Sequence, residues 1–125
     1  MMTFFVPGKP VGQGRITTIN RHSFHSNAKE LIPWRQTIAA YARAAKFPLL
    51  EGAISLSLDF LIVRPKTVKR DYPTVAPDLD HYVRAVGDAL KGIAYFDDAQ
   101  ITDLSASKRY HDSPGVMIDI RSLTK

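Results

Sequence analysis

The sequence predicts an α+β fold: a single compact domain in which a mixed β-sheet packs against two main helices. Three observations predict it. The chain has 125 residues, a length that normally forms one domain. Residues 53–63 alternate between apolar and polar side chains, as a half-buried strand does. Two other segments place apolar residues three and four positions apart, which is the spacing of one helical face.

The chain begins with a short predicted strand and two loops. The strand covers Thr3–Val6 and ends at the Pro7-Gly8 dipeptide. The segment Lys9–Arg15 is rich in glycine and proline, so we expect a loop there. The segment Asn20–Asn27 is polar and has no period, which predicts an exposed, mobile loop.

A helix and a long strand follow in the predicted order. The helix runs from Pro33, a residue suited to a first helical turn, to Ala45. Its expected buried face comprises Trp34, Ile38, Tyr41 and Ala45. The strand covers Ala53–Val63. Its expected buried residues are Ile54, Leu56, Leu58, Phe60 and Ile62.

The second half of the chain predicts a helix and two strands, which completes the order β-α-β-α-β-β. A basic, proline-bounded loop, Lys66–Pro73, precedes a helix over Pro77–Lys91, and Gly92 ends that helix. The expected buried stripe of this helix is Leu79, Val83, Val86 and Leu90. After a turn at Asp97-Asp98, the last two strands cover Ile101–Lys108 and Val116–Ile120. Residues 1–125 are therefore expected to form a single domain.

The composition excludes several classes of protein. With 45% hydrophobic and 23% charged residues, the chain is neither disordered nor fibrous. The absence of cysteine excludes disulfide scaffolds, thiolate metal sites and cysteine nucleophiles, so any metal must bind oxygen or imidazole. No apolar run reaches the length of a membrane helix, and the first residues lack the basic start of a signal peptide. We therefore expect a cytoplasmic protein with no membrane partner.

Charge is distributed unevenly along the chain and suggests a polyanionic partner. Residues 1–70 carry eleven basic and three acidic side chains, whereas residues 71–125 carry six basic residues and nine acids, all aspartate. A basic half is typical of proteins that bind nucleic acid, although many small basic proteins bind none. The basic residues expected to contact DNA phosphates are Lys9, Arg15, Arg21, Lys66, Lys69, Arg70 and Lys108.

Aspartates gather around the second predicted helix. Asp78 falls at the expected N-cap and Asp80 in the first turn. Such a pair is often simply a helix-capping arrangement, but two carboxylates this close repel each other unless a cation lies between them. With Asp97 and Asp98 beyond the helix, and a basic remainder, the pattern also fits phosphodiester hydrolysis that depends on a metal ion. His22 and His25 lack a carboxylate at ligand spacing and are poorer candidates.

The motifs at these positions are similar to those of one known family. They comprise Pro77-Asp78-Leu79-Asp80-His81, Arg84, Asp88-Ala89-Leu90, Gly92-Ile93-Ala94-Tyr95 and Asp97-Asp98-Ala99-Gln100-Ile101. In this order and spacing they resemble the RusA family of Holliday-junction resolvases, the crossover junction endodeoxyribonucleases. The resemblance extends to Val6–Pro10 and to Ser107-Lys108. It therefore spans nearly the whole chain.

The resemblance implies a homodimeric endonuclease of phage or bacterial origin. Such an enzyme would use Mg²⁺, with Mn²⁺ as a substitute, and would nick two strands of a four-way DNA junction symmetrically during recombination and repair. Asp78, Asp80 and Asp98 would be its catalytic, metal-binding carboxylates. Arg84 would be the catalytic cation, where the family usually has lysine, and His81 stands where it usually has asparagine. An arginine can stabilise phosphate charge but cannot exchange a proton near neutral pH.

A second hypothesis belongs to a different class of protein. The chain would be a catalytically inactive, basic module that binds DNA junctions, its carboxylates would cap a helix, and Arg84 would mark the loss of catalysis. Cleavage of a junction separates the two hypotheses, because only the enzyme nicks DNA. A glycosidase with two carboxylates is a distant third, since nothing in the sequence predicts a raised carboxyl pKa.

Overall fold

The computed structural model describes residues 2–14, 16–19, 21–25, 27–46 and 48–123. The main sheet of the fold is mixed and has four strands. The strands are β1 (Met2–Pro7), β4 (Ile54–Ile62), β5 (Ile101–Tyr110) and β6 (Gly115–Ser122). They lie in the order β1-β6-β4-β5. Strand β6 pairs antiparallel with both β1 and β4, whereas β4 and β5 are parallel. The α+β class and the order β-α-β-α-β-β are confirmed.

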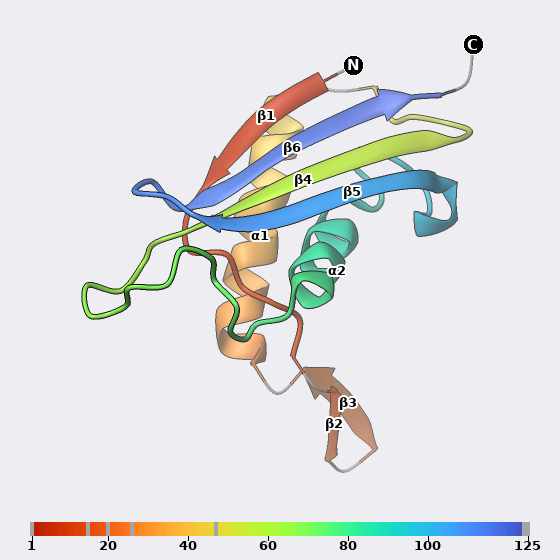
Figure 1. Ribbon diagram of the computed structural model, residues 1–125. Coiled ribbons are helices and arrows are strands. Elements are labelled where there is room, and N and C mark those ends of the chain that lie inside the picture. Colours follow the sequence, from red (N-terminus) through yellow and green to blue (C-terminus); the bar gives the residue numbers. More distant parts are fainter. Residues whose placement is uncertain (1, 15, 20, 26, 47, 124–125) are drawn as a thin grey trace.

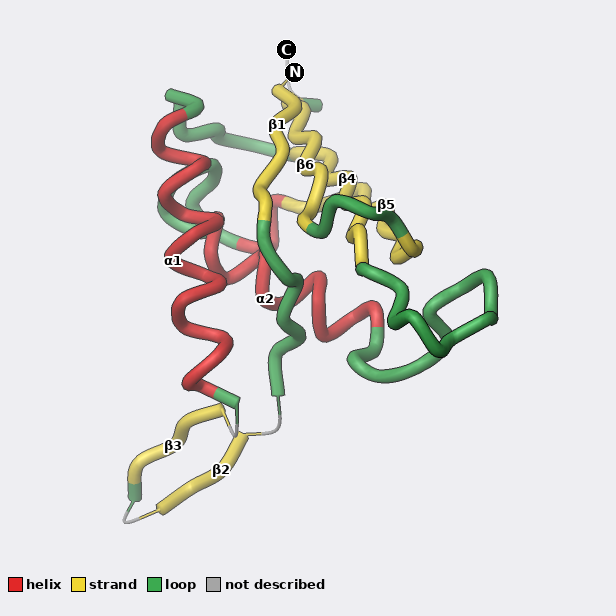
Figure 2. Tube along the Cα trace, turned by 90° about the vertical axis from the view of Figure 1, so that its left-hand side faces the viewer, coloured by secondary structure: helices red, strands yellow, loops and turns green. Residues whose placement is uncertain are grey.

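Two helices cover one face of this sheet, as Figures 1 and 2 show. They are α1 (Ala28–Ala44) and α2 (Leu79–Leu90), and they pack against each other as well as against the strands. Helix α2 connects the parallel strands β4 and β5, because parallel neighbours need a long crossover. Between helices and sheet lies one apolar core. None of the described helices is long and apolar enough to cross a membrane.

The alternation predicted for the central strand is confirmed. Ile54, Leu56, Leu58 and Phe60 of β4 are buried against the helices, and Ile62 is half-buried at the end of the strand. Val116, Ile118 and Ile120 of β6 face the same core. Strand β5 continues two residues beyond the predicted end, because its pairing with β4 extends to Tyr110.

The first helix differs from its prediction in both its start and its buried face. It begins at Ala28 rather than Pro33, because the backbone oxygen of Asn27 accepts hydrogen bonds from the amides of Glu30 and Leu31. Pro33 lies inside the helix, where it leaves one backbone hydrogen bond unmade. The residues that enter the core are Leu31, Trp34, Ile38 and Ala42. Tyr41, predicted to be buried, is 43% exposed.

The buried face of α2 was also predicted incorrectly in part. Val86 and Leu90 are buried as expected, but Leu79 and Val83 are only half-buried. The helix packs against α1 as well as the sheet, so its buried face is wider than the predicted stripe and is rotated around the helix axis relative to it. The other buried residues of α2 are Tyr82, Ala85, Gly87 and Ala89. Gly92 follows the helix with a φ of 85°, as its predicted role requires.

A small hairpin replaces one predicted loop. Strands β2 (Ile16–Ile19) and β3 (His22–His25) pair antiparallel across a two-residue turn, where the segment Asn20–Asn27 was expected to be irregular. Arg21 stands in that turn with a φ of 67°. The hairpin projects away from the sheet, beyond the start of α1 (Figure 1).

Phe60 links β4 to α2 and provides a test of the core. Its ring stacks on Tyr82 with a centroid separation of 5.1 Å. We expect Phe60→Ala to lower the free energy of unfolding by about 3–5 kcal/mol, because it leaves a cavity at a fully buried position. Urea unfolding measures this, with the exposed Leu123→Ala as the control, which should cost below about 0.5 kcal/mol. A loss below about 1 kcal/mol at Phe60 would contradict the packing described.

Candidate metal centre at the start of helix α2

The first turn of α2 brings several polar side chains together. Pro77 precedes the helix, and Asp78 is its N-cap in an extended conformation. The backbone oxygen of Asp78 accepts the first helical hydrogen bonds, from the amides of His81 and Tyr82. Its carboxylate makes no capping hydrogen bond with the helix. The simple capping role considered for Asp78 is therefore not what its side chain does.

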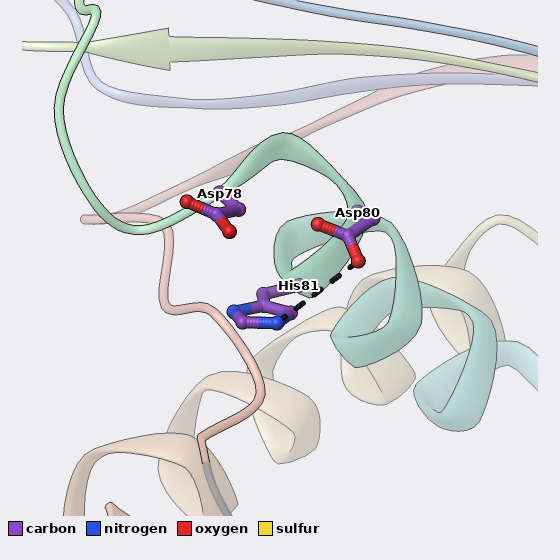
Figure 3. Close-up of side chains that lie close together, drawn as sticks. All are labelled: Asp78, Asp80 and His81. Carbon is purple, nitrogen blue, oxygen red and sulfur yellow. Dashed lines mark ion pairs between the residues drawn. The ribbon is translucent and has the colours of Figure 1, made fainter.

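Asp78, Asp80 and His81 form a cluster at this helix start. One potential ligand atom from each lies within 4.8 Å of those of the other two. The Nε2 atom of His81 is 4.0 Å from Oδ2 of Asp80. Figure 3 shows the two carboxylates and the imidazole ring on the same side of the first turn. They come from the N-cap and the second and third residues of the helix, so no long-range folding is needed to gather them.

The donors of this cluster suit a divalent cation. Two carboxylates and an imidazole supply oxygen and nitrogen ligands, and ligand atoms around an ion with bonds of about 2.1 Å lie up to about 4.2 Å apart. The His81 and Asp80 ligand atoms are 4.0 Å apart, and all three potential ligand atoms lie within 4.8 Å of one another. The side chains of Asp80 and His81 are 72% and 46% exposed, so they can adjust to an ion. The helix N-terminus itself favours negative charge. A cation between the carboxylates would remove their mutual repulsion.

An N-terminal loop packs against this first turn. The amide of Gln13 donates a hydrogen bond of 3.0 Å to the backbone oxygen of His81. A Cβ atom on Gly12 would lie 2.8 Å from the Pro77 side chain and 3.2 Å from Cβ of His81, so only glycine fits there. Asn27 holds the loop, since its amide donates to the Gly12 oxygen and accepts from the Gly14 amide.

Lys108 anchors the segment that leads into Asp78. Its ammonium group donates hydrogen bonds of 2.8 Å to the backbone oxygen of Val75 and 2.9 Å to that of Pro77. The sequence predicts that this lysine contacts DNA phosphate, and that role stays a prediction. In the structure Lys108 joins the edge strand β5 to the turn that carries the first carboxylate.

Arg84 lies one turn after Asp80 on α2. Both line a hollow of about 580 Å³, and the remaining lining residues are apolar: Leu79, Val83, Leu104 and Ala106. Arg84 is exposed and forms no ion pair with any residue that the structure describes. Its guanidinium is therefore available to an anion beside the acidic cluster. Asp88, on the next turn, is instead paired with Arg35 of α1 at 3.0 Å.

Asp98 lies outside the cluster, although it was grouped with Asp78 and Asp80 on the sequence. It is the first residue of the short 3₁₀ helix η1 (Asp98–Gln100), and its carboxylate lies beside Gly87 of α2. Gly87 is on the same face of α2 as Asp80 but about 10 Å further along the axis. The buried Tyr95 hydroxyl donates a hydrogen bond of 2.9 Å to the backbone oxygen of Gly87. Burial raises the pKa of Tyr95, and the charge of Asp98 raises it further.

The basic residues predicted to contact DNA occupy several places. Lys9 and Arg70 line a single hollow of about 290 Å³, together with Ala76 and Pro77, so these two cations lie close to the segment that enters Asp78. Lys66 and Lys69 are exposed on the loop between β4 and α2. Arg21 is exposed in the hairpin turn, and Arg15 falls outside the described residues.

Comparison with known proteins identifies the family. Residues 7–121 match the sequence pattern of the family described as "Endodeoxyribonuclease RusA". The chain belongs to the RusA family. A relative, the "Uncharacterized protein YqaN" of Bacillus subtilis (strain 168), is 30% identical over 136 aligned positions, which cover 97% of this chain and 96% of that protein. Membership of the RusA family supports a Holliday-junction-resolving endonuclease and implies endodeoxyribonuclease activity.

Sequence reasoning placed His81 beside the site but did not include it in the ligand set. The available signal was its position as third residue of the helix, from which a side chain commonly reaches back toward the N-cap. The supporting contacts of Gly12, Asn27 and Lys108 had no comparable signal. The hydrogen bonds of Asn27 and Lys108 join residues 13 to 33 positions apart, and Gly12 meets Pro77 and His81 much further along the chain, so these contacts are set by the tertiary fold.

Lys108→Met tests the anchoring role. Loss of two charged hydrogen bonds should lower the free energy of unfolding by about 1–3 kcal/mol and accelerate amide exchange in residues 74–80. Hydrogen exchange read by mass spectrometry measures the second effect. Lys29→Met, at an exposed position of α1, removes the same charge and should leave exchange in that segment unchanged. Equal exchange in both variants would show that Lys108 does not hold the turn.

Proposed function

We propose that this chain is a Mg²⁺-dependent endonuclease that resolves four-way DNA junctions by paired, symmetric nicks, as part of recombination and repair in the cytoplasm. Membership of the RusA family supports the reaction class. The observation that carries the proposal to particular residues is the cluster at the start of α2. There the carboxylates of Asp78 and Asp80 converge, and that of Asp78 makes no capping bond with the helix.

In the proposed mechanism the residues of α2 hold the ion and the scissile phosphate. A divalent ion, when bound, supplies an activated water and neutralises charge on the phosphate. Asp78 and Asp80 bind the ion through oxygen, the donor that Mg²⁺ prefers. Arg84, one turn further on and lining the same hollow as Asp80, donates N–H groups to the phosphate oxygens. It stabilises the added charge without exchanging a proton, because guanidinium remains protonated.

Asp98 is proposed as the third acidic residue of the site, and it acts from a neighbouring position. It faces the same side of α2 as Asp80, two turns away, at the side-chain-free surface of Gly87. The buried Tyr95 hydroxyl beneath it remains protonated, because burial and the charge of Asp98 both raise the pKa of Tyr95. A carboxylate there would bind the ion's hydration shell or a second ion rather than share the ion of Asp78.

The substrate is proposed to be branched DNA, gripped through its phosphates. Lys9 and Arg70 line the same hollow as Pro77, so they would hold the strand that enters the site. Lys66 and Lys69 would contact the junction arms from the loop between β4 and α2, and Arg21 from the hairpin turn. Arg15 and Lys108 are proposed to contact DNA phosphate as well. The protein would act as a homodimer, because a two-fold pair of sites matches the symmetry of a four-way junction and gives two equivalent cuts.

Cleavage of a labelled mobile four-way junction, beside linear duplex, tests the proposal. With Mg²⁺ we expect paired symmetric nicks in the junction only, and none with EDTA. Asp78→Asn should lower the cleavage rate by more than about a hundredfold, because it removes a ligand rather than a residue that merely orients one. Junction binding, measured by fluorescence anisotropy in EDTA, should persist in this variant.

Asp119→Asn is the matched control. It removes the same charge on β6, where Asp119 lies on the sheet face away from the helices and accepts a hydrogen bond from Arg121. This variant should cleave as the natural protein does. Tight junction binding by the natural protein without nicks under either Mg²⁺ or Mn²⁺ would contradict the enzyme and favour the inactive binding module.

Arg84 variants test the cation. Arg84→Gln should reduce the single-turnover cleavage rate by about 10²–10³-fold, the usual effect of losing one donor to developing charge. Arg84→Lys, which restores the residue typical of the family, should retain most of the rate, because its ammonium supplies the charge. Full activity of Arg84→Gln would place Arg84 outside the reaction.

A further inference from the structure

We propose that His81 is a ligand of the metal ion and that its imidazole shifts the ion preference of this site from Mg²⁺ toward Mn²⁺ and Co²⁺. The inference rests on the proposed function, since it concerns the ion held by Asp78 and Asp80. It goes beyond it, because the proposed function assigns the ion to two carboxylates, and His81 of the same cluster would add a nitrogen ligand. The chain would then bind a mixed oxygen–nitrogen set of ligands rather than oxygen alone.

The position of His81 in the helix directs its ring toward the carboxylates. As the third residue of α2 it lies where side chains reach back toward the N-cap, here Asp78. Its Nε2 atom is 4.0 Å from Oδ2 of Asp80, too long for a direct hydrogen bond and suited to two ligands of one ion. The three potential ligand atoms lie within 4.8 Å of one another.

The loop around Gly12 limits how far His81 can move. The Gln13 amide binds the His81 backbone oxygen, and the Gly12 backbone approaches Cβ of His81 so closely that a Cβ on residue 12 would lie 3.2 Å from it. The backbone and Cβ of His81 are therefore fixed on one side. Its side chain is 46% exposed and lies close to the two carboxylates (Figure 3), so an ion from solvent can reach it.

The chemistry of the donors then determines which ion binds best. Imidazole nitrogen binds Mn²⁺, Co²⁺ and later transition ions, with affinity rising along that series, whereas Mg²⁺ favours oxygen and retains its waters. An asparagine at the same position would offer a carbonyl oxygen and no such preference. Histidine rather than asparagine at position 81 therefore adds affinity for transition ions while leaving Mg²⁺ binding to the two carboxylates.

Metal titrations of the full chain test the inference without any substrate. They use a background carrying His22→Asn and His25→Asn, so that the hairpin histidines cannot bind the added ions. Mg²⁺, Mn²⁺ and Co²⁺ are titrated into this protein and into its His81→Asn, His111→Asn and Asp80→Asn derivatives. His111 is the matched control, an exposed histidine in the turn between β5 and β6. Circular dichroism verifies folding, and His81→Gln provides a second substitution.

We expect His81→Asn to weaken Co²⁺ binding by about ten- to a hundredfold and Mg²⁺ binding by less than about twofold. The visible absorption of bound Co²⁺ should change with loss of its nitrogen ligand, and Mn²⁺ should broaden the NMR signals of the His81 ring but not those of His111. His111→Asn should bind every ion as its parent does.

Two other results would overturn the inference and differ in what they say about function. If Asp80→Asn loses ion binding while His81→Asn binds all three ions as its parent does, His81 is not a ligand, and the proposed nuclease site stands. If the parent protein binds no ion even at millimolar concentration, and the junction assay also shows no metal-dependent nicks, the proposed function fails together with the inference.

Discussion

The stack of Phe60 on Tyr82 is the contact on which the rest of this structure depends. Phe60 belongs to the central strand β4 and is fully buried, and Tyr82 lies in the first turns of α2, where its amide binds the Asp78 oxygen. The most apolar part of the molecule therefore fixes the direction in which the helix begins. Lys108 fixes the same turn from strand β5, through carbonyl groups that precede the helix. Exposed carboxylates gain defined positions because their backbone is held from both the core and the sheet.

Placing acidic side chains at a helix start has an energetic logic. The partial positive charge of the helix end offsets part of their repulsion, by about 0.3–1 kcal/mol per carboxylate, and the basic first half of the chain lowers the cost further. The remaining repulsion favours a bound cation. Further along the helix, Asp88 pairs with Arg35, whereas Arg84 forms no ion pair with any described residue and lines the hollow beside Asp80.

The sequence predicted the fold class, the order of the elements and the alternation of β4, because these follow from local periodicity. It located Asp78 at the N-cap correctly, because Pro77 and the aspartate mark a helix start. It failed where tertiary packing sets the result. Helix α1 begins at Ala28 rather than at Pro33, because Leu31 packs in the core. The buried face of α2 includes Tyr82, because this helix contacts both α1 and the sheet. The distance of Asp98 from the cluster depends on how η1 meets Gly87, and no local pattern encodes that.

Asn27 closes the base of the β2–β3 hairpin by binding Gly12 and Gly14 on the opposite side of its entrance. The hydrogen bonds of Asn27 thus mark the boundary between the main domain and the arm, which is the β2–β3 hairpin. Residues added to or removed from the hairpin would change how far the arm extends, by about 3.3 Å per paired residue, without transmitting that change to the turn that carries Asp78. The length of the hairpin and the geometry of the proposed metal site can therefore change independently in evolution. The hairpin of such a protein can become longer or shorter while the turn that carries Asp78 keeps its structure.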